Sequence, residues 1–151
     1  MNIKTNSKYV KKHDIFICLH DDLENRHKYI KNIKKASAII IDEESEEKTK
    51  IPLIKVKDTN DTFFNIYNYY YDKPLKDLSL IGVTGTDGKT TTAMIIKRLL
   101  NIYSSSAYLG TNGFHYKTKK EKTKNTTPPV DIILKYAHTL KEENIKNVNL
   151  F

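Results

Sequence analysis

The sequence is poor in cysteine and arginine and contains no long hydrophobic run. Cys18 is its single cysteine, so neither a disulfide nor a cysteine-based metal site can form within the chain. A membrane-spanning helix needs about 20 consecutive apolar residues, and no run approaches that length. The lysine-rich N-terminus also lacks the apolar core of a signal peptide. These absences predict a cytoplasmic protein with no membrane partner.

The formal net charge is nevertheless +8, which ordinarily suggests an anionic partner such as a nucleic acid. Only Arg26 and Arg98 are arginines, however, and lysine is abundant together with isoleucine and asparagine, as is typical of an AT-rich genome. We interpret most of the basicity as codon bias and predict no nucleic-acid partner. A nucleic-acid-binding module that uses the lysines and tyrosines is the alternative from another functional class.

Glycine is scarce as well, and three of the five glycines lie between residues 82 and 88. The apolar residues 80–83 lead into Thr-Gly-Thr-Asp-Gly-Lys-Thr-Thr-Thr at 84–92, and residues 93–100 have helix-forming composition. A strand, a glycine turn, Lys-Thr and a helix are the context that a phosphate-binding loop requires, because glycines let backbone N–H groups converge on phosphate oxygens. The stretch therefore predicts a nucleotide site, although Val83 stands where the strict pattern has glycine. An ordinary glycine turn capped by threonines is the alternative.

The side chains of this loop suggest ATP and Mg²⁺ as cofactors. Lys89 would reach the β- and γ-phosphates, and the Thr90 hydroxyl would ligate Mg²⁺. Lys89 and Thr90 are thus the candidate catalytic residues, and Thr90 is the candidate metal ligand. The candidate nucleotide-binding residues are Gly85, Thr86, Asp87, Gly88, Lys89, Thr90 and Thr91.

Residues 84–92 resemble the ATP loop of the Mur ligases, which use ATP to build the peptide stem of bacterial peptidoglycan precursors. Most members have asparagine at the position of Asp87. Residues 6–17 resemble, with changes, the start of the MurE type, in which Asp-Ser-Arg and Val-Lys-Pro-Gly-Asp precede a Phe-Val-Ala strand. By this resemblance, Ser7 and residues around 20–27 would face the uridine diphosphate of the substrate.

Two stretches of the C-terminal half extend the resemblance. Tyr-Leu-Gly-Thr-Asn-Gly at 108–113 is similar to the family's Gly-Thr-x-Gly strand end, and Asn-Thr-Thr follows at 125–127. In MurE-type ligases an Asn-Thr-Thr at this point contacts the muramoyl-peptide, so the resemblance implies substrate binding by Asn125, Thr126 and Thr127. Helix capping also explains Thr127, since Pro128 would then occupy the first helical position.

Short apolar runs alternate with longer amphipathic segments, which predicts an α/β fold in two pieces joined near 72–74. Residues 1–73 are expected to form a small α/β domain that resembles the uridine-binding domain, incomplete because its first strand is expected to be missing. Residues 74–151 are expected to form the truncated start of a P-loop Mur ligase central domain. Its sheet should be mainly parallel, with the loop 84–90 at the carboxyl end of its strand.

Four further expectations concern local structure. Residues 42–50 are expected to form a charged loop, and the helix after the glycine loop should be well buried because it is apolar on several sides. Residues 113–124 should form a solvent-exposed hairpin, because lysines blunt exposed strand edges. The final strand, 148–151, is expected to leave apolar surface uncovered.

The resemblance covers nearly all of this chain but well under half of a full ligase, so the chain is identified as an N-terminal fragment of a MurE-type ligase. It implies ATP-dependent amide formation between a UDP-MurNAc-L-Ala-D-Glu-type substrate and an amino acid, lysine or diaminopimelate, by a monomer. The isolated chain is expected to bind nucleotide weakly and to be inactive. Another Mur ligase, a MurT-like amidating subunit, a cyanophycin-synthetase-like enzyme or a non-catalytic remnant are the alternatives.

Overall fold

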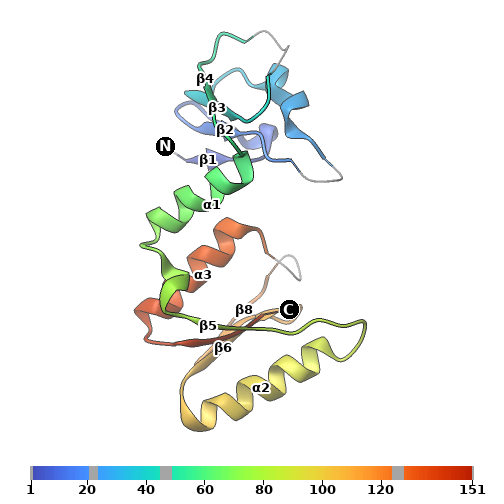
Figure 1. Ribbon diagram of the computed structural model, residues 1–151, viewed down its shortest axis with the longest axis vertical. Helices are drawn as coiled ribbons and strands as arrows, with labels where there is room; N and C mark the ends of the chain where they lie inside the picture. The colour runs from blue at the N-terminus through green and yellow to red at the C-terminus, as the bar shows by residue number, and fades with distance from the viewer. Residues whose placement is uncertain (1, 21–23, 45–48, 124–127, 151) are drawn as a thin grey trace. The chain divides into compact units, whose positions relative to one another are not determined.

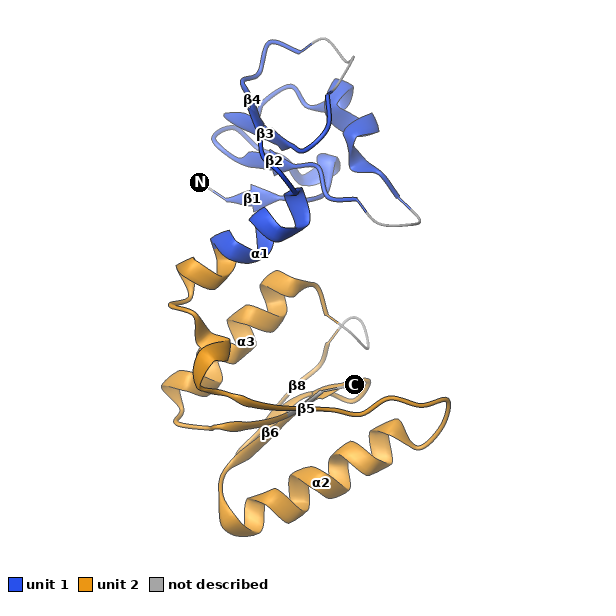
Figure 2. Ribbon diagram, viewed as in Figure 1, with its two compact units in different colours: residues 1–66 blue, residues 67–151 orange. Residues whose placement is uncertain are grey.

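The computed structural model describes residues 2–20, 24–44, 49–123 and 128–150 (Figure 1). It divides into two compact units, unit 1 (residues 1–66) and unit 2 (residues 67–151), as Figure 2 shows. This division falls inside helix α1 (Thr59–Tyr70), and a domain border at 72–74 stays a prediction. Among the described residues, no helix is both long enough and apolar enough to cross a membrane.

Unit 1 contains a four-stranded, fully parallel sheet in the order β1-β2-β3-β4. The two inner strands are apolar along their length because both faces of a parallel sheet are covered, and Phe16, Ile30 and Ile39 are fully buried in its core. Two short 3₁₀ helices, η1 (Ser7–Tyr9) and η2 (Arg26–Asn32), connect the first three strands. The strands are β1 (Ile3–Lys4), β2 (Ile15–Ile17), β3 (Ala38–Ile41) and β4 (Leu53–Lys55).

The expectation that the first strand of this unit is missing is wrong. Residues Ile3 and Lys4 pair in parallel with Ile15 and Phe16 of β2, so a two-residue first strand is present. The sequence gives little signal for so short a strand. Its place in the sheet is fixed instead by the neighbouring strand, because Ile15 N also donates to Asn2 O at 2.9 Å.

Unit 2 contains a five-stranded mixed sheet in the order β5-β9-β6-β7-β8. Strands β5, β9 and β6 are parallel, whereas β6, β7 and β8 form an antiparallel meander. Helices α2 (Lys89–Tyr103) and α3 (Val130–Glu142) lie on opposite faces of this sheet (Figure 1). The α/β class is thereby confirmed. The strands are β5 (Ser79–Gly82), β6 (Ser106–Gly110), β7 (Gly113–Tyr116), β8 (Lys119–Glu121) and β9 (Asn147–Leu150).

The apolar core of unit 2 lies on the face covered by α3. Strand residues alternate between the two faces of a sheet, so Ala107 and Leu109 of β6 pack with Phe114 of β7 on this side, together with Leu140 of α3. Val148 of β9 belongs to the same cluster and is buried. The expected apolar exposure of the last strand is therefore wrong for Val148, while Phe151 lies outside the described residues.

The sequence predicts a well-buried α2, and this prediction is wrong. Every residue of α2 is described, and of these only Ala93 is buried. Leu99 and Ile102 are 56% and 69% exposed and share a face with the half-exposed Ile95, at helical spacings of four and three residues. Helix α2 is thus apolar on two faces, and the described residues cover only one of them.

The hairpin at 113–124 is exposed only in part. All four residues of β7 are buried, because Phe114 and Tyr116 belong to the core, whereas β8 is exposed. The lysines do not simply face solvent either. Lys119 Nζ lies 3.0 Å from Glu143 Oε1 just beyond α3, and Lys117 pairs with the same carboxylate. Those contacts tie the hairpin to the helix.

Gly113→Ala should destabilise unit 2 by about 2 kcal/mol or more. Gly113 has a φ of +103°, and a Cβ there would lie 2.2 Å from Glu121 O on β8. The measurement is urea unfolding of both proteins. The matched control is Gly82→Ala, because a Cβ at Gly82 meets nothing within 4 Å. Equal losses of stability in the two variants would contradict the close approach of Gly113 to β8.

Candidate functional site

The candidate phosphate-binding loop connects the carboxyl end of β5 to the first residue of α2, as the sequence predicts. Gly85 and Gly88 have φ values of +148° and +75°, which side-chain-bearing residues rarely adopt. Gly88 is the N-cap of α2, so no side chain caps the helix. The first-turn N–H groups and the positive end of the helix dipole are therefore available to an anion.

Lys89 folds back over this loop. Its Nζ donates to Gly85 O at 2.6 Å and to Thr86 O at 2.9 Å. An ammonium group carries three N–H donors, so these two bonds leave one donor for a phosphate oxygen. The loop carbonyls thus fix the position of the positive charge over the loop.

Thr90 follows Lys89 in the first turn of α2 and is partly buried. The Thr90 oxygen is a suitable ligand for a hard cation such as Mg²⁺, which prefers oxygen ligands in octahedral geometry. One hydroxyl supplies only one of six ligands, so phosphate oxygens, waters or other groups would supply the rest. Thr86, Asp87 and Thr91 are exposed.

A second candidate site lies in unit 1 at Ser7. A cleft of about 310 Å³ is bordered by η1 on one side and by the start of η2 on the other. Asn6 Oδ1 accepts from Lys8 N at 3.0 Å and so caps η1, which fixes Ser7 at the cleft. The lining residues are Thr5, Asn6, Ser7, Lys8, Glu24, Arg26 and Tyr29.

The far wall of this cleft is held by a small polar cluster. Arg26 Nη1 donates to Thr5 O at 2.9 Å, and Tyr29 Oη donates to Glu24 Oε1 at 2.8 Å. The hydrogen bond from Tyr29 is the main reason that the pKa of Glu24 lies below its ordinary value. Lys8 and Arg26 carry positive charge at this cleft. Of the lining residues, the sequence resemblance predicts a substrate contact individually only for Ser7.

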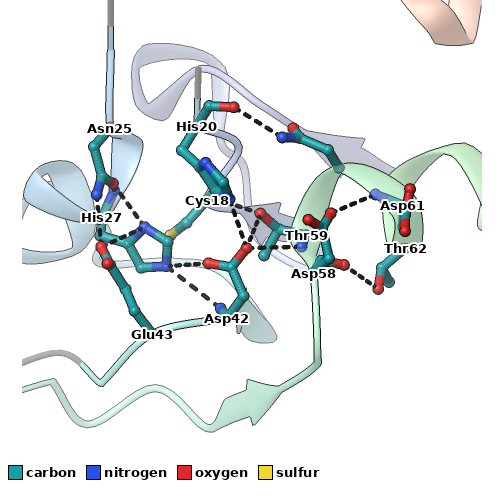
Figure 3. A network of polar contacts seen from close by, with 11 residues as sticks. Cys18, His20, Asn25, His27, Asp42, Glu43, Asp58, Thr59, Asp61 and Thr62 are labelled. Atoms are coloured by element: carbon teal, nitrogen blue, oxygen red, sulfur yellow. Dashed lines mark hydrogen bonds and ion pairs between the residues drawn. The ribbon is translucent and has the colours of Figure 1, made fainter. Parts of the chain in front are cut away.

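His20 and His27, which the resemblance would place near the uridine diphosphate, are engaged elsewhere. Both contact the buried carboxylate of Asp42 (Figure 3), through His20 Nε2 at 2.9 Å and His27 Nε2 at 3.2 Å. The backbone N and the hydroxyl of Thr59 each donate to Asp42 Oδ2 at 2.9 Å. The Thr59 hydroxyl oxygen also lies 2.8 Å from Cys18 O, so these two acceptors share its one proton. The network thus joins β2, η2 and β3 to the start of α1.

The charge state of this network follows from its contacts. Burial raises the pKa of Asp42, but the hydrogen bonds from Thr59 and His20 outweigh burial and hold it below the ordinary value. Burial, with the charges of Asp42 and Glu43 nearby, raises the pKa of the Cys18 thiol to about 12. Cys18 is therefore a packing residue rather than a nucleophile.

His20, Asp42 and Asp58 bring three ligand atoms within 4.8 Å of one another. Asp42 Oδ2 already accepts three hydrogen bonds, and Asp58 Oδ1 accepts from Asp61 N at 2.7 Å in the first turn of α1. Because protein donors occupy these oxygens, we interpret the cluster as the anchor of α1 rather than as a metal centre.

The remaining substrate-binding predictions, Asn125, Thr126 and Thr127, lie outside the described residues. Helix α3 begins at Val130 with Pro129 at the N-cap, and Pro129 O accepts from Ile132 N and Ile133 N at 3.0 Å. Pro128 is therefore not the first helical residue, and the predicted helix start is wrong by two positions.

The fold and the loop define an α/β protein in which a glycine turn of the phosphate-binding kind joins a parallel strand to a helix. Comparisons with known proteins agree. The Mur ligase middle domain matches residues 83–148. The chain is a homologue of the MurE-type Mur ligases.

Two relatives illustrate the match. The UDP-N-acetylmuramoyl-L-alanyl-D-glutamate--2,6-diaminopimelate ligase 2 of Clostridium acetobutylicum is 35% identical over 133 residues, which are 83% of this chain and 28% of that protein. The UDP-N-acetylmuramoyl-L-alanyl-D-glutamate--L-lysine ligase of Staphylococcus haemolyticus is 30% identical over 152 residues, which cover 99% of this chain and 31% of that protein. The chain thus spans less than a third of the length of these relatives.

Solved structures support the fold. A UDP-N-acetylmuramoyl-L-alanyl-D-glutamate--2,6-diaminopimelate ligase superposes with a TM-score of 0.70 at 23% identity, over 99% of this chain and 31% of the other. MurF from Thermotoga maritima in complex with ADP gives a TM-score of 0.50 at 24% identity, over 98% of this chain and 31% of that structure.

Asp42→Asn should destabilise unit 1 by about 1–3 kcal/mol at neutral pH, because an amide cannot accept from all the donors around this carboxylate. The folded-state pKa of Asp42 lies below the ordinary 3.8. The contribution of the ionised Asp42 to the free energy of unfolding is therefore fully present above pH 3.8, the ordinary pKa, and is lost as the pH falls through the lower folded-state pKa.

Urea unfolding at several pH values measures this difference. The difference in the free energy of unfolding between wild type and variant should be constant near neutral pH and should become smaller below about pH 4. Glu44→Gln, at a side chain that is 91% exposed, is the matched control and should have little effect. A gap that persists unchanged into acid would contradict the charge assignment.

Proposed function

We propose that residues 84–90 bind the phosphates of ATP with Mg²⁺, and that the whole protein is an ATP-dependent ligase of the MurE type. The observation that carries this proposal is the conformation of the loop. Two glycines with positive φ precede an uncapped helix N-terminus, and Lys89 Nζ is fixed over the loop. A phosphoryl group bound here would meet N–H donors, a helix dipole and one ammonium.

The reaction would join an amino acid to a UDP-MurNAc-L-Ala-D-Glu-type substrate. ATP would supply a γ-phosphoryl group to the substrate carboxylate, and the amine would displace phosphate to form the amide. Protein groups contribute to phosphoryl transfer mainly by positioning and by stabilising charge. In this proposal Lys89 neutralises charge on the phosphates, and Thr90 Oγ1 is a Mg²⁺ ligand.

The uridine diphosphate of the substrate would bind in the cleft at Ser7. Lys8 and Arg26 border the cleft and would offset the negative charge of a diphosphate, while the Ser7 hydroxyl can donate to or accept from a polar ligand. Glu24 is ionised but bonded to Tyr29 and Arg26, which limits its repulsion of an anion. The amine would come from lysine or diaminopimelate, since ligases for both are among the relatives.

Lys89→Ala should weaken ATP binding roughly 10- to 150-fold, because a charge-assisted contact to phosphate contributes about 1.5–3 kcal/mol. The measurement is calorimetric titration with ATP and Mg²⁺. The control is Lys76→Ala, at an exposed lysine of the 3₁₀ helix η3 (Pro74–Asp77). Asp87→Asn should be neutral or mildly strengthening, because it removes a negative charge. Equal affinities for wild type and Lys89→Ala would refute the site.

Ser7→Ala should weaken UDP binding about 2- to 13-fold, the effect of one hydrogen bond worth about 0.5–1.5 kcal/mol. Titration with UDP in the absence of ATP isolates this cleft. Ser37→Ala, at an exposed serine of the same unit, is the matched control. If both variants bound UDP as wild type does, the cleft would not be the uridine site.

A further inference from the structure

Asp87 lies inside the candidate phosphate-binding loop, between the two glycines with positive φ and directly before Gly88, the N-cap of α2. The loop closes tightly here, because Asp87 O would lie only 3.6 Å from a Cβ at Gly85. Asp87 itself is not among the residues with positive φ, so other side chains can replace it without backbone strain. Its carboxylate therefore belongs to the same turn whose backbone N–H groups are offered to an anion.

The negative charge of Asp87 is not neutralised by the lysine of the loop. Lys89 Nζ donates to Gly85 O and Thr86 O instead. Asp87 is exposed, and its carboxylate forms no hydrogen bond or ion pair with the residues that the structure describes. Thr86 O belongs to the peptide group that leads directly into Asp87. A phosphate that contacts the Lys89 ammonium would therefore also lie near an unpaired negative charge.

The formal charge of the loop is zero, because Asp87 and Lys89 are the only ionised side chains of residues 84–90. Attraction of an anion then depends on the helix N-terminus and on one ammonium. In water, each negative charge of a ligand at about 4–8 Å from an exposed carboxylate weakens binding about 2- to 6-fold. A bound Mg²⁺ cancels two negative charges of a nucleotide, so the carboxylate repels the Mg²⁺ complex less than the free nucleotide.

We propose that Asp87 is a specificity residue that makes nucleotide binding depend on Mg²⁺: its carboxylate repels free ATP more strongly than the Mg²⁺ complex of ATP. The effect requires no contact between Asp87 and the cation. It acts by excluding the wrong form of the ligand, and Thr90 Oγ1 remains the candidate Mg²⁺ ligand. The inference rests on the proposed function, in which this loop binds ATP with Mg²⁺.

The test is calorimetric titration of the full 151-residue chain with ATP at low ionic strength, once with excess Mg²⁺ and once with EDTA. Asp87→Asn keeps the size of the side chain and removes its charge. It should raise the affinity in EDTA at least about 5-fold more than the affinity with Mg²⁺, because the free nucleotide carries two more negative charges. In about 0.5 M salt this difference should shrink, since salt screens exposed charges.

Two further variants separate charge from shape and from position. Asp87→Glu keeps the charge and should keep the Mg²⁺ dependence of wild type. Glu142→Gln removes an exposed negative charge at the end of α3, on the face of the sheet opposite α2 (Figure 1), and is the matched control. It should leave both affinities unchanged.

The outcomes distinguish this inference from the proposed function. An Asp87→Asn variant that binds free ATP no better than wild type, or that binds it too weakly to measure, would overturn the role of Asp87. So would a variant that loses affinity only with Mg²⁺, because Asp87 would then hold the cation. Wild type that binds no ATP in Mg²⁺, or a Lys89→Ala variant that binds it equally well, would instead show that the proposed function is wrong, and this inference with it.

Discussion

The conformation of two glycines determines most of what unit 2 can do. Gly85 and Gly88 turn the chain through positive φ angles between β5 and α2, and no side chain caps the helix that follows. The consequence is a helix N-terminus that faces outward at the end of a parallel strand, where α/β proteins place their ligands. Lys89 can bond to Gly85 O and Thr86 O only because the turn presents these carbonyls to it.

Unit 1 depends on a different constraint, the charge of Asp42, whose side chain is only 9% exposed. Burying a carboxylate is unfavourable unless donors surround it, and here Thr59, His20 and His27 all contact it. These partners come from separate segments, so the carboxylate can be satisfied only when η2, β3 and the start of α1 are all in place. The cleft at Ser7 is formed by η1 and η2, and the contact with His27 helps to hold η2 there.

The sequence predicts features with a local cause. Gly-Lys-Thr after an apolar run locates the turn and the start of α2, and alternating short apolar segments predict the α/β class. Features that depend on distant residues are missed. Asp42 follows the last residue of β3 and lies beside a stretch of charged residues, and no local sequence pattern predicts that its side chain is largely covered. Helix α2 has enough apolar residues to be enclosed, but burial depends on what packs against its second face.

Strand β6 shows how one short segment can pack against both helices of unit 2. Its residues alternate, so Ala107 and Leu109 stabilise unit 2 on the α3 face while Tyr108 points to the other face, where α2 packs against β6. A shift of register by one residue would exchange these roles completely. The antiparallel pairing of Tyr108 with His115, and of Leu109 with Phe114, prevents that shift, because both members of each pair require the same face. The packing of the α3-side core therefore also fixes the Tyr108 side chain on the α2 face, where its hydroxyl accepts from Asn112 N.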